Sequence, residues 1–184
     1  MNFMTMAAPR LAWAITGSGH YITECVELML SMPDTDLYLS QAGEEVLKMY
    51  GVQLSDLKRK LPVYRDKAAS APPVGLFYKN YYHTLVMAPT TSNSVAKCVL
   101  GIADSLVTNL YAQAGKCRVP SIVFACDTAP EMPTTAPGGK TVMVYPRPID
   151  LQATDTLRNF AFTQVVDDVA QLELALQQRL ASLS

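Results

Sequence analysis

Apolar and polar residues along the chain follow two alternating patterns: short unbroken apolar runs, and longer segments with an apolar residue every three or four positions. A short apolar run bounded by glycine or proline is typical of a buried strand, and the wider spacing is typical of a helix with one buried face. The runs that predict strands are residues 11–16, 36–40, 83–89, 121–127 and, as a last strand, 141–146.

The segments between these runs predict helices. The first begins at Ile22 and is stopped by Pro33, a second short helix covers residues 42–51, and residues 95–110 form a long helical segment with Gly101 as a candidate break. A final amphipathic helix is marked by Val165, Val169, Leu172, Leu176 and Leu180. The stretch 54–80 contains prolines and is weakly periodic, so we expect a functional loop or an interface there.

Alternation of strands and helices predicts an α/β fold, a Rossmann/flavodoxin-like three-layer sandwich with a mostly parallel sheet. A length of 184 residues predicts a single domain over residues 1–184. In such folds ligands lie beyond the carboxyl ends of the strands, so we expect the site in the loops that begin at Gly17, Ser40, Pro89 and Asp127.

Composition excludes several classes of protein. The net charge is −1 and charged residues make up 17% of the chain, so nucleic acid is not an expected partner. No apolar run approaches the ~18 residues that span a bilayer, and no basic region precedes the first apolar stretch, so we expect no membrane segment and a cytoplasmic location. The scattered cysteines indicate buried free thiols rather than a disulfide framework or a metal site, and they are Cys25, Cys98, Cys117 and Cys126.

The loop after the first predicted strand reads GSGHYI and contains only part of a dinucleotide-binding fingerprint. Ile22 stands where the third glycine would be, and Ser40 follows the second strand in place of the acidic residue that would hold a ribose. Free N–H groups at a helix start, with the hydroxyls of Ser18 and Ser40, would instead suit a phosphate monoester. An ordinary tight turn at Gly17 and Gly19 is the alternative.

The segment PTTSNS, residues 89–94, places a run of hydroxyl and amide side chains at the start of another helix. One of Ser92, Asn93 or Ser94 can be a simple N-cap. The density of polar groups exceeds what capping requires, so we favour a second helix start that holds the same phosphate.

Several motifs together resemble the flavoprotein family of homo-oligomeric flavin-binding proteins, which includes cysteine decarboxylases, prenyl-flavin synthases and dihydromethanopterin reductases. These motifs are ITGSGH, SQAGEEV, APTTSNSVAKCVLGIADSLVTN and AQAGK. In that family the segment equivalent to residues 89–94 commonly reads Pro-Ala-Ser-Ala-Asn-Thr and wraps the phosphate and one edge of FMN. The resemblance implies FMN as cofactor, bound by Gly17, Ser18, Gly19, Ser40, Pro89, Thr90, Thr91, Ser92, Asn93 and Ser94.

Within the family, GSGH, SQAGEEV, GIADSLVTN, AQAGK and RPIDL are similar to the dihydromethanopterin reductases. This implies reduction of a dihydropterin to its tetrahydro form, by ping-pong hydride transfer through bound FMN. A pterin presents an amide N–H and an amine along one edge, for which a carboxylate is a bidentate partner, so Asp127 and Glu131 are candidate pterin contacts and Asp127 is the candidate catalytic residue. A helix or turn cap is the alternative role for Asp127, and a water is the alternative proton source.

Two other functions remain open: an FMN-dependent cysteine decarboxylase of the phosphopantothenoylcysteine decarboxylase type, and a flavin electron-transfer protein without a small-molecule substrate. The Pro-x-Met-Asn clamp of the decarboxylases is absent from residues 127–151, and His83 is more simply explained as a structural residue at a strand start. Asn93 stands where the prenyl-flavin synthases would have a lysine.

The resemblance also implies a homotrimer or an assembly of trimers, with a dihydropterin as substrate. The electron donor would be reduced flavin, a nicotinamide or a redox protein. Tyr78, Tyr81 and Tyr82 could stack on the flavin or pack in the core or at a subunit contact. Lys116 and Arg118 could attract an anionic cofactor tail or simply follow the end of a helix, whose dipole favours cations.

Overall fold

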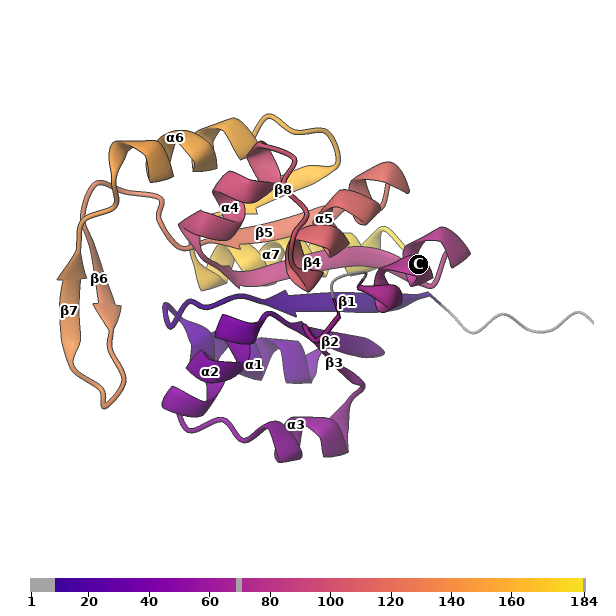
Figure 1. Ribbon diagram of the computed structural model, residues 1–184, viewed down its shortest axis with the longest axis horizontal. Helices are drawn as coiled ribbons and strands as arrows, with labels where there is room; N and C mark the ends of the chain where they lie inside the picture. The colour runs from indigo at the N-terminus through magenta and orange to yellow at the C-terminus, as the bar shows by residue number, and fades with distance from the viewer. Residues whose placement is uncertain (1–8, 69–70, 184) are drawn as a thin grey trace, which may run out of the picture.

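The computed structural model describes residues 9–68 and 71–183, which form a six-stranded sheet, a separate two-stranded hairpin and the helices that cover the sheet (Figure 1). The strands of the sheet are β1 (Arg10–Ile15), β2 (Thr35–Leu39), β3 (Val63–Arg65), β4 (Tyr82–Thr90), β5 (Ser121–Ala125) and β8 (Thr163–Val166). Their order is β3-β2-β1-β4-β5-β8, and each neighbouring pair is parallel. With the hairpin set aside, this is the 3-2-1-4-5-6 order of doubly wound Rossmann sheets.

Helices cover both faces of the sheet and produce the expected three layers. The helical elements are α1 (Ile22–Ser31), α2 (Gln41–Met49), α3 (Leu54–Lys60), η1 (Pro72–Lys79), α4 (Ser92–Val99), α5 (Leu106–Lys116), α6 (Pro148–Leu157) and α7 (Val169–Ala181). Side chains of β1 alternate between two buried clusters, because successive strand residues point to opposite faces. Leu11, Trp13 and Ile15 pack with α1, α2, α3 and α7, whereas Ala12 and Ala14 pack with η1, α4, α5 and α6. The α/β fold is therefore confirmed.

The expected last strand does not join the sheet. Residues 141–144 form β7 (Thr141–Val144), which pairs antiparallel with β6 (Met132–Thr135) in a hairpin that projects from the body (Figure 1). Side chains of β7 alternate between exposed and half-buried, which does not suit a parallel strand covered on both faces. The sixth strand of the sheet is instead β8.

The start of the C-terminal helix also differs from the prediction. Val165 lies in β8, and α7 begins only at Val169. Asp168 sets this boundary, because its carboxylate accepts a hydrogen bond from the N–H of Gln171 at 2.7 Å and caps the helix. Val165 matches the helical spacing of the following residues, but its side chain belongs to the sheet.

Two further segments gain detail from the structure. Gly101 breaks the long helical segment as expected: α4 ends at Val99, Gly101 adopts a φ of +72°, and Ser105 begins α5 with a capping box. The stretch 54–80 contains α3, β3 and η1, and its residues 69 and 70 lie outside the described part of the chain.

No helix in residues 9–68 or 71–183 is long and apolar enough to cross a membrane. All four cysteines are free thiols, and Cys117 alone among them is half-buried rather than buried. The same described residues contain no group of three or more His, Cys, Asp or Glu side chains placed to hold a metal ion.

Candidate functional site

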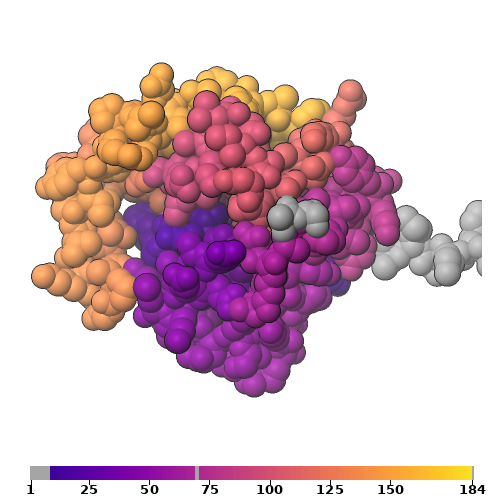
Figure 2. Space-filling view, viewed as in Figure 1, coloured from indigo at the N-terminus to yellow at the C-terminus, as the bar shows by residue number. Residues whose placement is uncertain are grey.

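The loops that follow β1, β4 and β5 meet at the carboxyl edge of the sheet and, together with the hairpin, line a cavity of about 330 Å³. Figure 2 shows the hollow that separates the hairpin, in orange, from the N-terminal residues in indigo and purple. The strand order reverses between β1 and β4, which is where doubly wound sheets bind ligands. The cavity brings together six candidates that are scattered in the sequence: Gly17, Ser18, Gly19, Thr91, Ser92 and Asp127.

Thr16 joins the first two of these loops. Its N–H and its hydroxyl both donate to the carbonyl oxygen of Pro89, at 3.2 and 3.1 Å, and its hydroxyl oxygen accepts from the N–H of Thr91 at 2.8 Å. Thr16 is buried, so these bonds are protected from water. Thr16 is not among the predicted site residues, although a polar residue directly after an apolar strand is a usable signal.

Close packing explains both glycines of the first loop. A Cβ on Gly17 would lie 2.6 Å from the Cβ of Ala42 in α2, and a Cβ on Gly19 would lie 2.1 Å from the hydroxyl of Tyr50. Neither glycine has a positive φ, so the simple left-handed turn is not the reason for them. Their lack of side chains lets the loop lie against α2 while its backbone borders the cavity.

Several backbone N–H groups around the cavity have no acceptor. Thr91 is the N-cap of α4, and its hydroxyl accepts from the N–H of Ser94 at 3.2 Å. In the described part of the chain no acceptor exists for the N–H groups of Gly17, Ser18, Gly19, Ser92 and Asn93. Unpaired N–H groups at a helix start and in a glycine loop form a site for an anion such as a phosphate monoester.

Other predicted residues do not reach the cavity wall. The Ser40 hydroxyl accepts from the N–H of Gly43 at 2.9 Å and caps α2, so the structure shows the capping role rather than a ligand contact. Thr90 is fully buried and its hydroxyl donates to the carbonyl of Met87 at 2.7 Å, which leaves it unable to face the cavity. The remaining candidates that line no part of this cavity are Pro89, Asn93 and Ser94.

Asp127 lies half-buried directly after β5 and borders the cavity. Its carboxylate makes no hydrogen bond within residues 9–68 and 71–183, so it does not cap a helix or turn there. Its backbone carbonyl accepts from the Thr154 hydroxyl at 3.1 Å, which fixes the residue against α6. Glu131 is exposed and does not border the cavity.

His20 is a site residue that the sequence analysis did not select. It is 9% exposed, its ring packs against those of Tyr21 and Phe124, and its Nδ1 lies 3.1 Å from the hydroxyl oxygen of Thr134 on β6. Its Nε2 is buried and has no hydrogen-bond partner among the described residues. Burial lowers the pKa of His20, and the negative charges of Asp127 and Glu24 oppose this shift.

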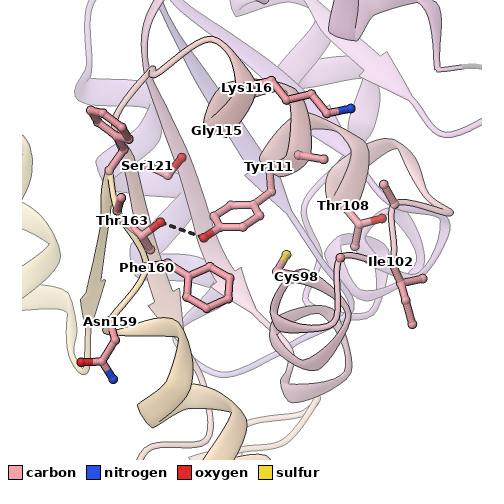
Figure 3. Close-up of a pocket in the computed structure, with 15 residues that line it drawn as sticks. Cys98, Ile102, Thr108, Tyr111, Gly115, Lys116, Ser121, Asn159, Phe160 and Thr163 are labelled. Atoms are coloured by element: carbon pink, nitrogen blue, oxygen red, sulfur yellow. Dashed lines mark hydrogen bonds between the residues drawn. The ribbon is translucent and has the colours of Figure 1, made fainter.

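A second cavity, of about 410 Å³, lies at the other end of the sheet (Figure 3). Ser121 and Thr163, which begin β5 and β8, border it, and the Tyr111 hydroxyl bonds to that of Thr163 at 2.7 Å. None of the predicted cofactor-binding residues lines this cavity, whereas Lys116 does. Lys116 therefore lies at the end of the sheet opposite to the proposed phosphate site.

The tyrosine cluster also lies at the amino end of the sheet. Tyr82 begins β4, donates to the carboxylate of Asp36 at 2.8 Å and shares a 2.6 Å hydrogen bond with Tyr38. Tyr78 and Tyr81 are exposed near it and do not border the cavity at the carboxyl ends. Tyr82 therefore has a packing role in the core and does not stack on a ligand in that cavity.

A model of the Flavoprotein family matches residues 4–183. The chain belongs to the flavoprotein family. The resemblance inferred from the motifs GSGH and PTTSNS is thereby confirmed, and it spans nearly the whole chain.

Named relatives point to one branch of the family. The chain is 42% identical over 135 residues to dihydromethanopterin reductase (acceptor) of Methanosarcina mazei, covering 66% of this chain and 56% of the relative. It is 37% identical over 148 residues to the enzyme of the same name from Methanocaldococcus jannaschii. This match covers 73% of this chain and 60% of the relative. The chain therefore spans less than two thirds of the length of these two curated relatives.

A solved structure resembles the chain over nearly its full length. This is DmrB of Burkholderia xenovorans in complex with FMN, described as a cubic protein cage for redox transfer. The two share 47% sequence identity and superimpose with a TM-score of 0.89, covering 95% of this chain and 97% of that one.

Proposed function

We propose that this chain is an FMN-dependent oxidoreductase that reduces dihydromethanopterin, or a related dihydropterin, to the tetrahydro form. The observation that carries the proposal is the cavity at the strand-order reversal, lined by the glycine loop and the start of α4. Support comes from the similarity to a flavoprotein solved with FMN and to relatives named dihydromethanopterin reductase.

The residues around the cavity fit FMN better than a dinucleotide. The N–H groups of Ser18, Gly19 and Ser92, which have no acceptor in the part of the chain that the structure describes, suit a phosphate monoester, which FMN carries at the end of its ribityl chain. No acidic residue follows β2 to hold an adenine ribose, because Ser40 is at that place and caps α2. No Lys or Arg is among the described residues that line the cavity, so backbone dipoles carry the anion binding.

Asp127 is the proposed contact for the pterin. Its carboxylate borders the cavity without a hydrogen-bond partner among the described residues, so it can accept two hydrogen bonds from the amide N–H and the amine of a pterin edge. Bound FMN would supply the hydride after reduction by a donor that then leaves, which gives ping-pong kinetics. The donor is proposed to be free reduced flavin, a nicotinamide or a redox protein.

We also propose a homo-oligomer, a trimer or an assembly of trimers, in a reducing compartment such as the cytoplasm. Exposed apolar side chains at Leu100, Ile102 and Phe162 are compatible with subunit contacts, and the DmrB relative is described as a cage. Free thiols suit a reducing compartment. Light scattering at micromolar concentration should show no 20.1 kDa monomer, and a monomer would contradict the assembly.

Steady-state turnover of the Asp127→Asn protein tests the assignment of the pterin contact. The loss of a charged hydrogen-bond acceptor should reduce kcat/KM for the dihydropterin by about 10- to 100-fold without changing the affinity for FMN. Glu131→Gln, which removes an exposed carboxylate outside the cavity, is the matched control. Normal pterin reduction by Asp127→Asn would contradict the role of Asp127. Release of carbon dioxide from a cysteinyl substrate would favour the decarboxylase.

A further inference from the structure

The proposed reaction needs an acid that Asp127 does not supply. Reduction of a C=N bond adds a hydride to carbon and a proton to nitrogen. A carboxylate that binds the amide and amine edge of the pterin must be ionised, and it then only accepts hydrogen bonds. The proton has to come from a water or from another side chain of the cavity. Three other titratable side chains border the cavity, those of His20, Tyr50 and Cys126.

Tyr50 and Cys126 are poor acids in this setting. Burial raises the pKa of the Cys126 thiol to about 12, and its side chain also lies in contact with the Ser18 hydroxyl. Burial raises the pKa of Tyr50 as well, and its hydroxyl already donates to the carbonyl of Thr135 at 2.6 Å. His20 differs from both, because burial lowers its pKa and makes its protonated form a stronger acid.

The geometry of His20 suits a proton donor. Its Nε2 is buried without a hydrogen-bond partner among the described residues. An unpaired buried polar atom costs free energy unless a ligand supplies the missing hydrogen bond. Nδ1 lies beside the Thr134 hydroxyl, whose oxygen can accept from Nδ1–H both in the protonated ring and in the neutral tautomer that remains when Nε2 has given up its proton. The ring therefore keeps the same anchor in both protonation states.

We propose that His20 is the proton donor of this site, with its Nε2–H transferring a proton to the ring nitrogen of the dihydropterin as the neighbouring carbon receives hydride from the reduced flavin. This rests on the proposed function. The C=N π bond is lost, C–H and N–H bonds form, and neutral His20 regains its proton from solvent. Thr134 and Thr135 tie the hairpin to His20 and Tyr50, so the hairpin forms part of the cavity wall beside the ring.

The charges that face His20 favour its protonated form. Asp127 after β5 and Glu24 in the first turn of α1 both act on it electrostatically, and Tyr21 and Phe124 pack their rings against it. His20 also borders an adjoining cavity of about 300 Å³, where Glu24 and Thr134 lie. No Lys or Arg occurs among the described residues that line either cavity.

The test compares His20→Gln with His83→Gln in FMN-loaded protein. The chain has only these two histidines, and His83 lies at the opposite end of β4 with its Nδ1 bonded to the Thr84 hydroxyl. We expect His20→Gln to slow single-turnover pterin reduction by about 100-fold or more, with an unchanged Kd for FMN. The wild-type rate should fall as pH rises through the pKa of His20, and this fall should be absent in His20→Gln and present in His83→Gln.

Nitrogen-15 NMR of the two histidines in the oxidised FMN complex gives a second readout that needs no turnover. Addition of dihydropterin should shift the Nε2 signal of His20 and leave that of His83 in place. An unmoved His20 signal, or a His20→Gln protein with wild-type rate and pH profile, would overturn the proposal while leaving the reductase intact. A wild-type protein that reduces no pterin would contradict both the function and this role of His20.

Discussion

The N–H of Thr91 donates a hydrogen bond of 2.8 Å to the hydroxyl oxygen of Thr16, which joins two segments that are 75 residues apart in the sequence. Thr16 ends the apolar run of β1, and Thr91 caps α4. The bond occupies the N–H of Thr91, whereas the next two N–H groups, those of Ser92 and Asn93, have no acceptor among the described residues and stay available to a ligand. It therefore aligns the glycine loop with the helix start across the cavity.

Replacing Thr16 by Val should destabilise the protein by about 1–3 kcal/mol, because the N–H of the half-buried Thr91 loses its acceptor. The affinity for FMN should fall as well, since the two loops are no longer held in register. Urea unfolding and FMN titration measure the two effects. Thr16→Ser keeps the hydroxyl and should be close to wild type, and an equal loss in both variants would show that the methyl group, not the hydrogen bond, is what matters.

Gly17→Ala should cost about 1–3 kcal/mol of unfolding free energy, because the new Cβ would lie 2.6 Å from the Cβ of Ala42. The next nearest atoms of Ala42 are at 3.5 and 3.6 Å, which is ordinary contact. Combining Gly17→Ala with Ala42→Gly should therefore relieve the clash. The double variant should remain less stable than wild type by about 1 kcal/mol of unfolding free energy, because glycine is a poor helix former in α2. A double variant as unstable as the sum of the two single variants would argue against this contact.

Ser18→Ala and Ser92→Ala should each weaken FMN binding by about 10- to 100-fold, the effect of losing one hydrogen bond to a charged group. Ser40→Ala should behave differently. It removes the N-cap of α2 and should cost about 0.5–2 kcal/mol of stability with no change in FMN affinity. Fluorescence titration and thermal unfolding of the three variants separate these roles. Unchanged affinity in both Ser18→Ala and Ser92→Ala would refute the hydroxyl contacts and leave only the backbone N–H groups to hold the phosphate.

The ion pair of Arg147 and Asp150 should make stability depend on pH. Arg147 donates to both carboxylate oxygens of Asp150, at 2.9 and 2.8 Å, and this lowers the pKa of Asp150. Because the folded pKa lies below the unfolded one, the stabilisation is present above the unfolded pKa of about 3.9 and is lost as pH falls through the folded pKa.

Asp150→Asn should therefore be less stable than wild type at neutral pH, and the difference should shrink in acid below about pH 4. Urea unfolding across this range measures it. Asp155→Asn is the matched control, because the side chain of Asp155 is 80% exposed and its contact with Arg158 is 3.8 Å long. A difference between wild type and Asp150→Asn that does not vary with pH would show that lost packing, not charge, is responsible.

Most of the fold could be read from the hydrophobic pattern, because a parallel sheet makes each central strand a continuous apolar run. β1, β2, β4 and β5 follow that rule and every one of their residues after Arg10, apart from His83, is buried. β8 does not, since it is a short edge strand with half-buried positions, and its Val165 also matches the spacing of the next helix. β7 is apolar enough to suggest a sheet strand, yet it lies in the hairpin.

The site was predictable where it depends on loop position and not where it depends on side-chain partners. Gly17, Ser92 and Asp127 were placed together because the carboxyl ends of neighbouring parallel strands converge. The capping role of Ser40 depends on one hydrogen bond and the bridging role of Thr16 on three, and no periodicity reveals them. His20 was passed over for the same reason, since its burial against Phe124 and the hairpin is a tertiary effect.

The most direct test of the account is an anaerobic stopped-flow experiment on the FMN-loaded protein. The flavin is first reduced with one equivalent of dithionite, and the complex is then mixed with dihydromethanopterin while the flavin absorbance is followed. We expect the flavin to reoxidise in a single turnover, with one tetrahydropterin formed for each FMN. Flavin that stays reduced in the presence of saturating dihydropterin, but reoxidises with a redox protein, would contradict the reductase and favour an electron carrier.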